Sequence, residues 1–281
     1  MPQQVRMTVP LMRVSMWALM VGAYSCLSML KSYPPLVYVP EIPTGIDAAL
    51  SLAMALIIAF RVNRAYERWW EARTLWGTLV NASRNLAVKI RELHHPEVED
   101  RQRARNLIVA FANGFKDHLR GDSDLRTLPG FETDEAVLHH IPSYIVRQLY
   151  RLFDQWKGAG KLSDQQLWIL DAEARILLDV CGGCERIKTT LMSISWRFFT
   201  WQCIAVYLLV LPWGLVDVFG VWTIPLTIVI AYFVIAGEGI AHYVEEPFGM
   251  HEDHLDLERI CREIDRSVSE ILSTDACFQE S

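Results

Sequence analysis

Apolar residues gather into four stretches that are candidates for membrane-spanning helices. These stretches cover residues 14–30, 46–60, 198–216 and 221–240. A helix that crosses the hydrocarbon core needs about 20 predominantly apolar residues, with a range of roughly 17–25. The last two stretches satisfy this requirement, the first satisfies it narrowly, and the second is short. A short span suits a helix that lies among protein helices and faces a pore.

The first stretch has a second interpretation, because a secretory signal peptide also follows basic residues such as Arg6 and Arg13. A signal peptide ends at a cleavage site marked by small residues. No such site is clear here, and three further apolar stretches follow. We therefore expect a membrane span in this position.

Basic residues near the ends of the stretches predict how the chain crosses the membrane. Cytoplasmic loops carry an excess of lysine and arginine. Bases precede the first stretch, follow the second and precede the third, whereas segments 31–45 and 217–220 contain a single base, Lys31. Both termini and the middle of the chain are therefore predicted to be cytoplasmic.

The rest of the sequence predicts helices. Residues 61–93 contain no proline and one glycine, so the second span should continue as one helix. Segments 108–119 and 257–271 repeat apolar residues at helical spacing, and Ser163 with Gln166 fits a capping box. We expect an all-α membrane protein with four transmembrane helices per subunit and a large helical cytoplasmic region. The predicted parts are 1–60 (first two spans), 61–197 (cytoplasmic helices), 198–240 (last two spans) and 241–281 (cytoplasmic C-terminal segment).

Three bulky apolar residues lie along one face of the second span. Leu52, Leu56 and Phe60 are spaced by four residues, and most of their neighbours are small. Small residues let helices approach closely in a membrane, so several copies of this face around an axis would form a narrow hydrophobic collar that gates ions by dewetting. A bulky stripe more commonly faces lipid or a neighbouring helix. Four spans are also too few to enclose a pore, so a channel requires a ring of subunits.

Charged residues continue this face beyond Phe60. Arg64, Glu67 and Glu71 follow at helical spacing. They fit internal ion pairs along the helix, but rings of such residues would also select ions, Arg64 favouring anions and Glu67 favouring cations. The sequence leaves the choice between anions and cations open.

Composition narrows the class of protein. Hydrophobic residues make up 52% of the 281 residues, and the mean hydropathy of +0.17 is high for a soluble enzyme. The formal net charge of −6 leaves no basic excess for binding nucleic acid. The six cysteines do not form a disulfide scaffold.

Three blocks of sequence resemble the bestrophin family. The run FRVNRAYERWWEARTLWGTLVNASRNL (60–86), with its aromatic residue and Arg-Trp-Trp cluster after the second span, is similar to the family's signature beyond the pore helix. GGCERIKTT (182–190) and EEPFG (245–249) are similar to two further signatures of bacterial members. The order and spacing of the blocks agree with the family over nearly the whole chain.

The resemblance implies a homopentameric ion channel in which each subunit joins four identical copies in the bacterial inner membrane. It places a pore neck at Leu52, Leu56 and Phe60 and a cytoplasmic aperture at Ile187. Bestrophins are best known as chloride channels, so small monovalent ions, membrane lipid and further subunits are the expected partners. Animal members clasp calcium with acids after Asn-Pro-Phe-Gly, but here only Glu252 and Asp253 are adjacent acids after PFG. We therefore expect no cofactor and no calcium gating.

Other candidate sites have weaker patterns. Cys181 and Cys184 have the C-x-x-C spacing of redox and zinc sites, but no second cysteine pair or well-spaced histidine pair completes a zinc site. The glycines between them are expected to let the chain turn. Glu238, near the end of the fourth span, suits either a functional acid within the membrane or an acid that is solvated or paired at the cytoplasmic end. Histidine pairs occur at 94–95, 139–140 and 251/254, where exposed loop positions, pH sensing or metal binding remain open.

Three functions compete at this point. The leading prediction is a passive bestrophin-like channel, with anions favoured by the resemblance and a cation-selective channel of the same fold as the alternative. A membrane-bound thiol-redox protein would instead use Cys181 and Cys184. A non-conducting scaffold would use the cytoplasmic helices to dock partners. We expect no enzymatic activity and no metal site.

Overall fold

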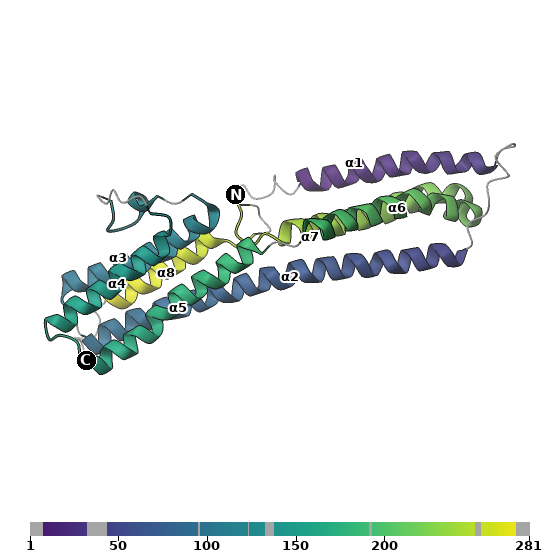
Figure 1. Ribbon diagram of the computed structural model, residues 1–281. Coiled ribbons are helices and arrows are strands. Elements are labelled where there is room, and N and C mark those ends of the chain that lie inside the picture. Colours follow the sequence, from purple (N-terminus) through teal and green to yellow (C-terminus); the bar gives the residue numbers. More distant parts are fainter. Residues whose placement is uncertain are drawn as a thin grey trace, which may run out of the picture. The chain divides into compact units, whose positions relative to one another are not determined.

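The computed structural model describes residues 8–32, 44–94, 96–122, 124–132, 138–190, 193–250 and 254–273. Within these residues the regular elements are all helices and no strand occurs (Figure 1), which confirms the predicted all-α class. The chain packs as two units: residues 1–67 with 191–245 form unit 1, and residues 68–190 with 246–281 form unit 2. The division into two units reflects which residues pack together and does not locate the membrane. The predicted membrane boundaries at residues 60, 197 and 240 therefore stay predictions.

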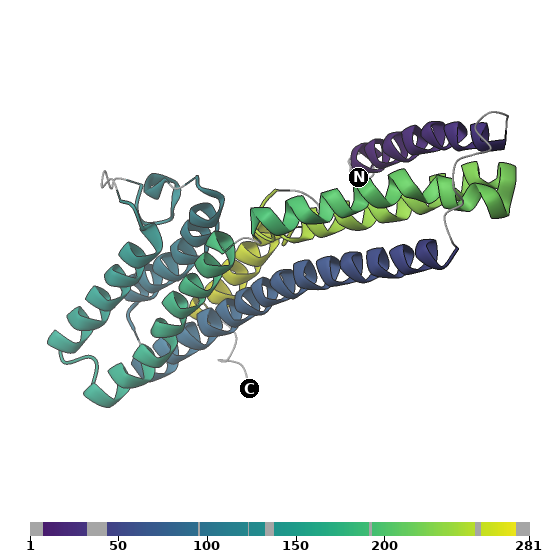
Figure 2. The same ribbon diagram turned by 45° about the vertical axis from the view of Figure 1, so that its right-hand side comes forward.

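Unit 1 contains the apolar helices. Helix α1 (Thr8–Ser25) continues into a 3₁₀ segment (Cys26–Ser32), and α6 (Ile194–Phe219) is joined to α7 (Thr223–Val244) by a single 3₁₀ turn (Gly220–Trp222). Figure 2 shows α6 and α7 running side by side after this reversal. Gly220 has a φ of 52°, a backbone conformation that glycine adopts without a steric penalty.

Three helical segments of the described chain are long and apolar enough to cross a membrane. They are Met12–Lys31, Gly45–Leu93 and Ile194–Val244. The last segment holds both α6 and α7, so it accounts for two of the four predicted spans. Its apolar residues pack with those of α1 and α2 in a core that includes Ala18, Met54, Ile204, Leu211 and Ala231.

Helix α2 (Thr44–Lys89) contributes to both units and ends in one π-helical turn (Ile90–His94). The predicted continuation of the second span as one long helix is therefore confirmed. The absence of proline removes the usual cause of a break in a helix. Its single glycine beyond the span, Gly77, interrupts nothing.

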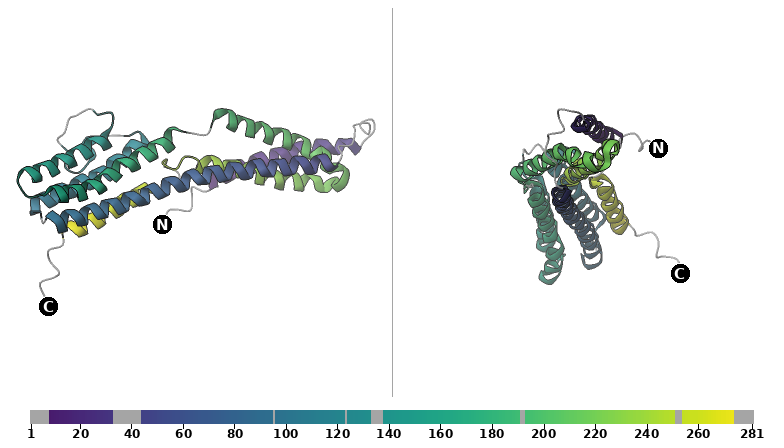
Figure 3. Two further views of the ribbon diagram at one scale, coloured as in Figure 1. Left: turned by 60° about the horizontal axis from the view of Figure 1, so that its bottom comes forward. Right: turned by 90° about the vertical axis from the view of Figure 1, so that its right-hand side faces the viewer.

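Unit 2 is a bundle of amphipathic helices. Helices α3 (Val98–Arg120), α4 (Ile141–Gly158), α5 (Asp164–Thr189) and α8 (Leu257–Ser273), with a short 3₁₀ turn (Leu125–Thr127), pack with one face of the C-terminal part of α2 (Figure 3). The predicted stripe on α3 is buried, and so is the stripe on α8 apart from Ile271, which is partly exposed. Trp76 stacks on Phe115 with ring centroids 5.1 Å apart, which fixes α2 against α3.

Helix α5 confirms one local prediction and corrects another. Ser163 and Gln166 form the predicted capping box at its start. The predicted turn at Gly182 and Gly183 is wrong, because α5 runs through both residues. Gly183 serves close packing instead, since a Cβ there would lie 2.9 Å from Leu75 of α2.

Candidate pore-lining face and its supporting charges

The predicted neck residues lie on a face of α2 that its own chain leaves uncovered. Leu52, Leu56 and Phe60 are 73%, 54% and 58% exposed. The small residues around them are exposed as well: Ala48, Ala49, Ala53, Ala55 and Ala59. Burial of a large apolar side chain is worth about 1.5–3 kcal/mol relative to exposure. This face is therefore stable against lipid, another protein surface or a narrow dry passage, and unfavourable against bulk water.

A buried charge cluster fixes the opposite side of the same helix. Arg61 is 0% exposed. Its Nε donates to Oε1 of Glu238 at 3.3 Å, and its Nη2 donates to Oε2 of Glu245 at 2.7 Å. Glu238 lies on α7, and Glu245 caps its C-terminus, so both carboxylates face α2 from one helix. Charged groups at such depth are stable only when they are paired.

This cluster decides one open question and adds a residue. Glu238 is a buried, paired acid rather than a solvated one. The sequence showed Arg61 only as one of the bases that follow the second span. The available signal was an arginine at the end of an apolar stretch together with two glutamates, seven residues apart, at the end of another. What the sequence lacked was the pairing, which joins residues 177 and 184 positions apart.

The charges beyond Phe60 lie on the surface. Arg64 is paired with Glu67 at 3.0 Å, as internal pairing predicts, and the side chain of Arg64 is 69% exposed. Glu71 instead contacts Arg186 of α5 at 2.8 Å, a partner that the sequence did not suggest. Exposed pairs of this kind contribute about 0–1 kcal/mol. A role in ion selection stays a prediction for Arg64, Glu67 and Glu71.

Ile187 lies within the core of unit 2. Its side chain is 4% exposed, and its carbonyl oxygen accepts a hydrogen bond from Nη2 of Arg68 at 2.6 Å. The single chain thus presents the exposed neighbours Arg186 and Lys188 at this point of α5 rather than the isoleucine. The aperture at Ile187 remains a prediction from the resemblance.

The cysteine pair is unsuited to thiol chemistry. Cys181 and Cys184 are both buried and both free. Burial raises the pKa of Cys181 to about 12 and also raises the pKa of Cys184. Because the thiolate is the nucleophile in thiol exchange, neither residue is activated at neutral pH.

The predicted histidine sites divide between described and undescribed residues. His95 and residues 251–253 lie outside the described part of the chain, so the site proposed for His251 and the acids that follow PFG are not seen. His140 lies close to His118 and Glu185 in unit 2. The sequence did not bring His118 into consideration, because it stands alone on α3.

Comparison with known proteins agrees with this arrangement. The family model described as Bacterial/Fungal Bestrophin protein matches residues 5–270. The Nostoc protein named "Voltage-dependent anion channel-forming protein alr2987" is 30% identical over 232 residues, which are 79% of this chain and 76% of that protein. The Synechocystis protein named "Voltage-dependent anion channel-forming protein sll1024" is 30% identical over 86% of this chain and 81% of its own length.

Solved structures show the same architecture. A bacterial bestrophin homologue from Klebsiella pneumoniae superposes with a TM-score of 0.85 at 26% identity, covering 92% of this chain and 98% of that chain. A variant of that homologue with a single tyrosine-to-alanine substitution gives a TM-score of 0.86 and covers 93% and 99%. The apolar helices and the family match make the chain a membrane channel protein rather than an enzyme. The chain belongs to the bacterial and fungal branch of the bestrophin family.

Proposed function

We propose that the chain forms a homopentameric channel of the bacterial inner membrane that passes small monovalent anions, with both termini in the cytoplasm. The observation that supports it is the uncovered stripe of Leu52, Leu56 and Phe60 on α2. Five copies of this stripe facing one axis would line a hydrophobic neck. Such a neck excludes water when it is narrow and conducts when it widens.

The buried charge cluster supports the orientation of this stripe. Arg61 directly follows Phe60, and successive residues of an α-helix point about 100° apart. Because Arg61 is tied to Glu238 and Glu245 of α7, rotation of α2 about its axis is restricted. Near the other end of the span, Ser51 and Tyr207 of α6 lie within hydrogen-bond distance at 3.1 Å. The two links hold the stripe away from the interior of the chain.

The anion preference draws on the relatives, which are named voltage-dependent anion channel-forming proteins. Purified protein in planar bilayers under a potassium chloride gradient tests it. An anion channel reverses near the chloride equilibrium potential. Reversal near the potassium potential would refute anion selectivity and establish a cation channel of the same fold.

Neck variants test the pore assignment. Leu52→Ala, Leu56→Ala and Phe60→Ala should each increase single-channel current or open probability, because a smaller side chain widens and wets the constriction. Phe233→Ala on α7 is the matched control, since Phe233 is an aromatic residue of unit 1 with 66% exposure. Equal effects of Phe60→Ala and Phe233→Ala would refute the neck. Native mass spectrometry of the purified protein tests the number of subunits.

A further inference from the structure

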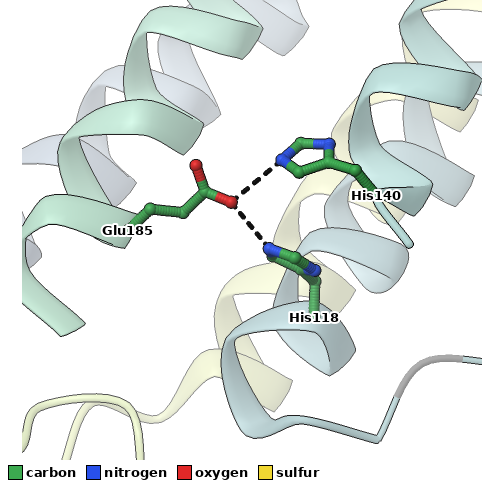
Figure 4. A group of neighbouring side chains, drawn as sticks. All are labelled: His118, His140 and Glu185. Atoms are coloured by element: carbon green, nitrogen blue, oxygen red, sulfur yellow. Dashed lines mark hydrogen bonds and ion pairs between the residues drawn. The ribbon is translucent and has the colours of Figure 1, made fainter. Parts of the chain in front are cut away.

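Three side chains from three helices of unit 2 meet at one point. His118 lies in the last turn of α3, His140 caps the N-terminus of α4, and Glu185 lies near the end of α5 (Figure 4). Nε2 of His118 is 2.7 Å from Oε1 of Glu185, and Nε2 of His140 is 2.9 Å from the same oxygen. One potential ligand atom from each residue lies within 4.8 Å of the other two.

We propose that His118, His140 and Glu185 bind a first-row divalent transition metal ion of the Zn²⁺ class. Two imidazole nitrogens and one carboxylate oxygen form a ligand set that suits such ions, whereas Mg²⁺ and Ca²⁺ prefer oxygen ligands. This inference goes beyond the channel proposal, and it departs from our expectation of no metal site. It also concerns residues distinct from the acids that follow PFG.

The three side chains have to adjust before they can hold a metal ion. With Zn–N and Zn–O distances of about 2.0–2.1 Å and tetrahedral angles, neighbouring ligand atoms lie roughly 3.3 Å apart. The two nitrogen–oxygen distances, 2.7 and 2.9 Å, are shorter than this. The carboxylate of Glu185 therefore has to withdraw by about half an ångström, which its partly exposed side chain permits. The two histidine nitrogens, which lie within 4.8 Å of each other, have to reach the same spacing.

The proton arrangement around His140 also has to change. Its Nδ1 accepts a hydrogen bond from the backbone N–H of Ser143 at 3.1 Å, so the neutral ring carries its proton on Nε2, facing Glu185. A metal ion on Nε2 moves that proton to Nδ1 and breaks this cap. One capping hydrogen bond is a small contribution compared with three metal–ligand bonds.

The fourth position is open to solvent. All three ligand side chains are partly exposed, so water can complete the coordination. Sγ of Cys181 lies 4.0 Å from Nε2 of His140, but the three ligand atoms that lie within 4.8 Å of one another come from His118, His140 and Glu185. We therefore assign two histidines, one glutamate and one water, without the thiol. A bound ion would fasten the adjacent ends of α3, α4 and α5 together.

The test uses the full-length protein in detergent after treatment with a chelator. Titration with Zn²⁺ alone should show one site per chain and raise the thermal unfolding midpoint, whereas Mg²⁺ should do neither. His118→Gln, His140→Asn and Glu185→Gln should each weaken Zn²⁺ binding at least tenfold. His140→Asn is chosen because asparagine also caps helices. His139→Gln, at the exposed neighbouring histidine, is the matched control and should bind like the wild type.

Two results would overturn the proposal. One is Zn²⁺ binding that is equal in the wild type and the three ligand variants, since the ion would then bind elsewhere. The other is a Co²⁺ complex with strong thiolate charge-transfer absorption, which would place Cys181 in the site and disprove the ligand set. Variants that elute as the wild type in size-exclusion chromatography show that any loss of binding is not a loss of folding.

Discussion

Replacing Arg61 by alanine would leave the carboxylates of Glu238 and Glu245 buried in unit 1 without the guanidinium that now contacts both. Removing one partner of a buried ion pair costs about 3–5 kcal/mol, because the remaining charge stays shielded from water and no longer has an opposite charge beside it. Arg61 is fully buried and the two carboxylates are nearly so, at 2% and 4% side-chain exposure. The full cost therefore applies to this cluster.

Arg64→Ala provides the matched control. Arg64 lies on the same helix, three residues further on, and is also paired with a glutamate, but its side chain is 69% exposed. Solvent screening limits the contribution of such a pair to about 0–1 kcal/mol. The comparison therefore changes burial while it keeps residue type, helix and partner chemistry.

Thermal unfolding of the purified protein in detergent measures the difference. Each kcal/mol shifts the midpoint of a chain of this size by roughly 2–4 °C, so Arg61→Ala should lower the midpoint by roughly 6–20 °C and Arg64→Ala by less than about 4 °C. The triple variant Arg61→Met, Glu238→Gln, Glu245→Gln should recover much of the loss, because it no longer buries an uncompensated charge. Equal midpoints for Arg61→Ala and Arg64→Ala would show that the buried cluster contributes no more stability than an exposed pair.

Three further predictions concern unit 2. Gly182→Ala should raise the unfolding midpoint, because the position is helical with open space around it. Alanine is favoured over glycine in a helix by about 0.5–1 kcal/mol. Gly183→Ala should not raise the midpoint, because its Cβ would meet a side chain of α2 at 2.9 Å. Alkylation of Cys181 by iodoacetamide, followed by mass spectrometry, should be slow in the folded protein and fast in denaturant, and equal rates would contradict its burial. A hydrogen bond from Lys116, at 3.0 Å, lowers the pKa of Glu258 below its ordinary value of 4.5. The side chain of Glu258 is 48% exposed, which limits the stabilisation to at most about 1 kcal/mol. This stabilisation should be complete above pH 4.5 and disappear as the pH falls through the lowered pKa. The difference in midpoint between wild type and Glu258→Gln should therefore vanish in acid.

The sequence predicted those features that depend on neighbours along the chain. The continuity of α2, the capping box at Ser163 and the stripe of Leu52, Leu56 and Phe60 all follow from residues a few positions apart. Helical periodicity places such residues on one face whatever the rest of the fold does.

Features that join distant residues were missed or misread. Arg61 meets Glu238 across 177 positions, and His118 meets Glu185 across 67. No periodicity along one helix specifies which residue of another helix lies opposite. Gly183 was misread for the same reason, since the requirement for a small residue comes from a side chain of α2 and not from a local turn.

The two parts of α2 also differ in what covers them. The helices of a single chain bury the apolar residues in only one of these parts. In unit 2 its apolar residues Trp76, Leu79 and Leu86 are fully buried by helices of the same chain. In unit 1 the apolar stripe is exposed, although exposure of such side chains to water is unfavourable by about 1.5–3 kcal/mol each. The first set is buried when the chain folds, whereas the second set needs lipid or other copies of the chain to cover it. Leu79→Ala should therefore lower stability by about 2–5 kcal/mol, whereas Leu56→Ala should leave the unfolding midpoint nearly unchanged and alter conduction. The reverse pattern would mean that the stripe stabilises the subunit and does not line a pore.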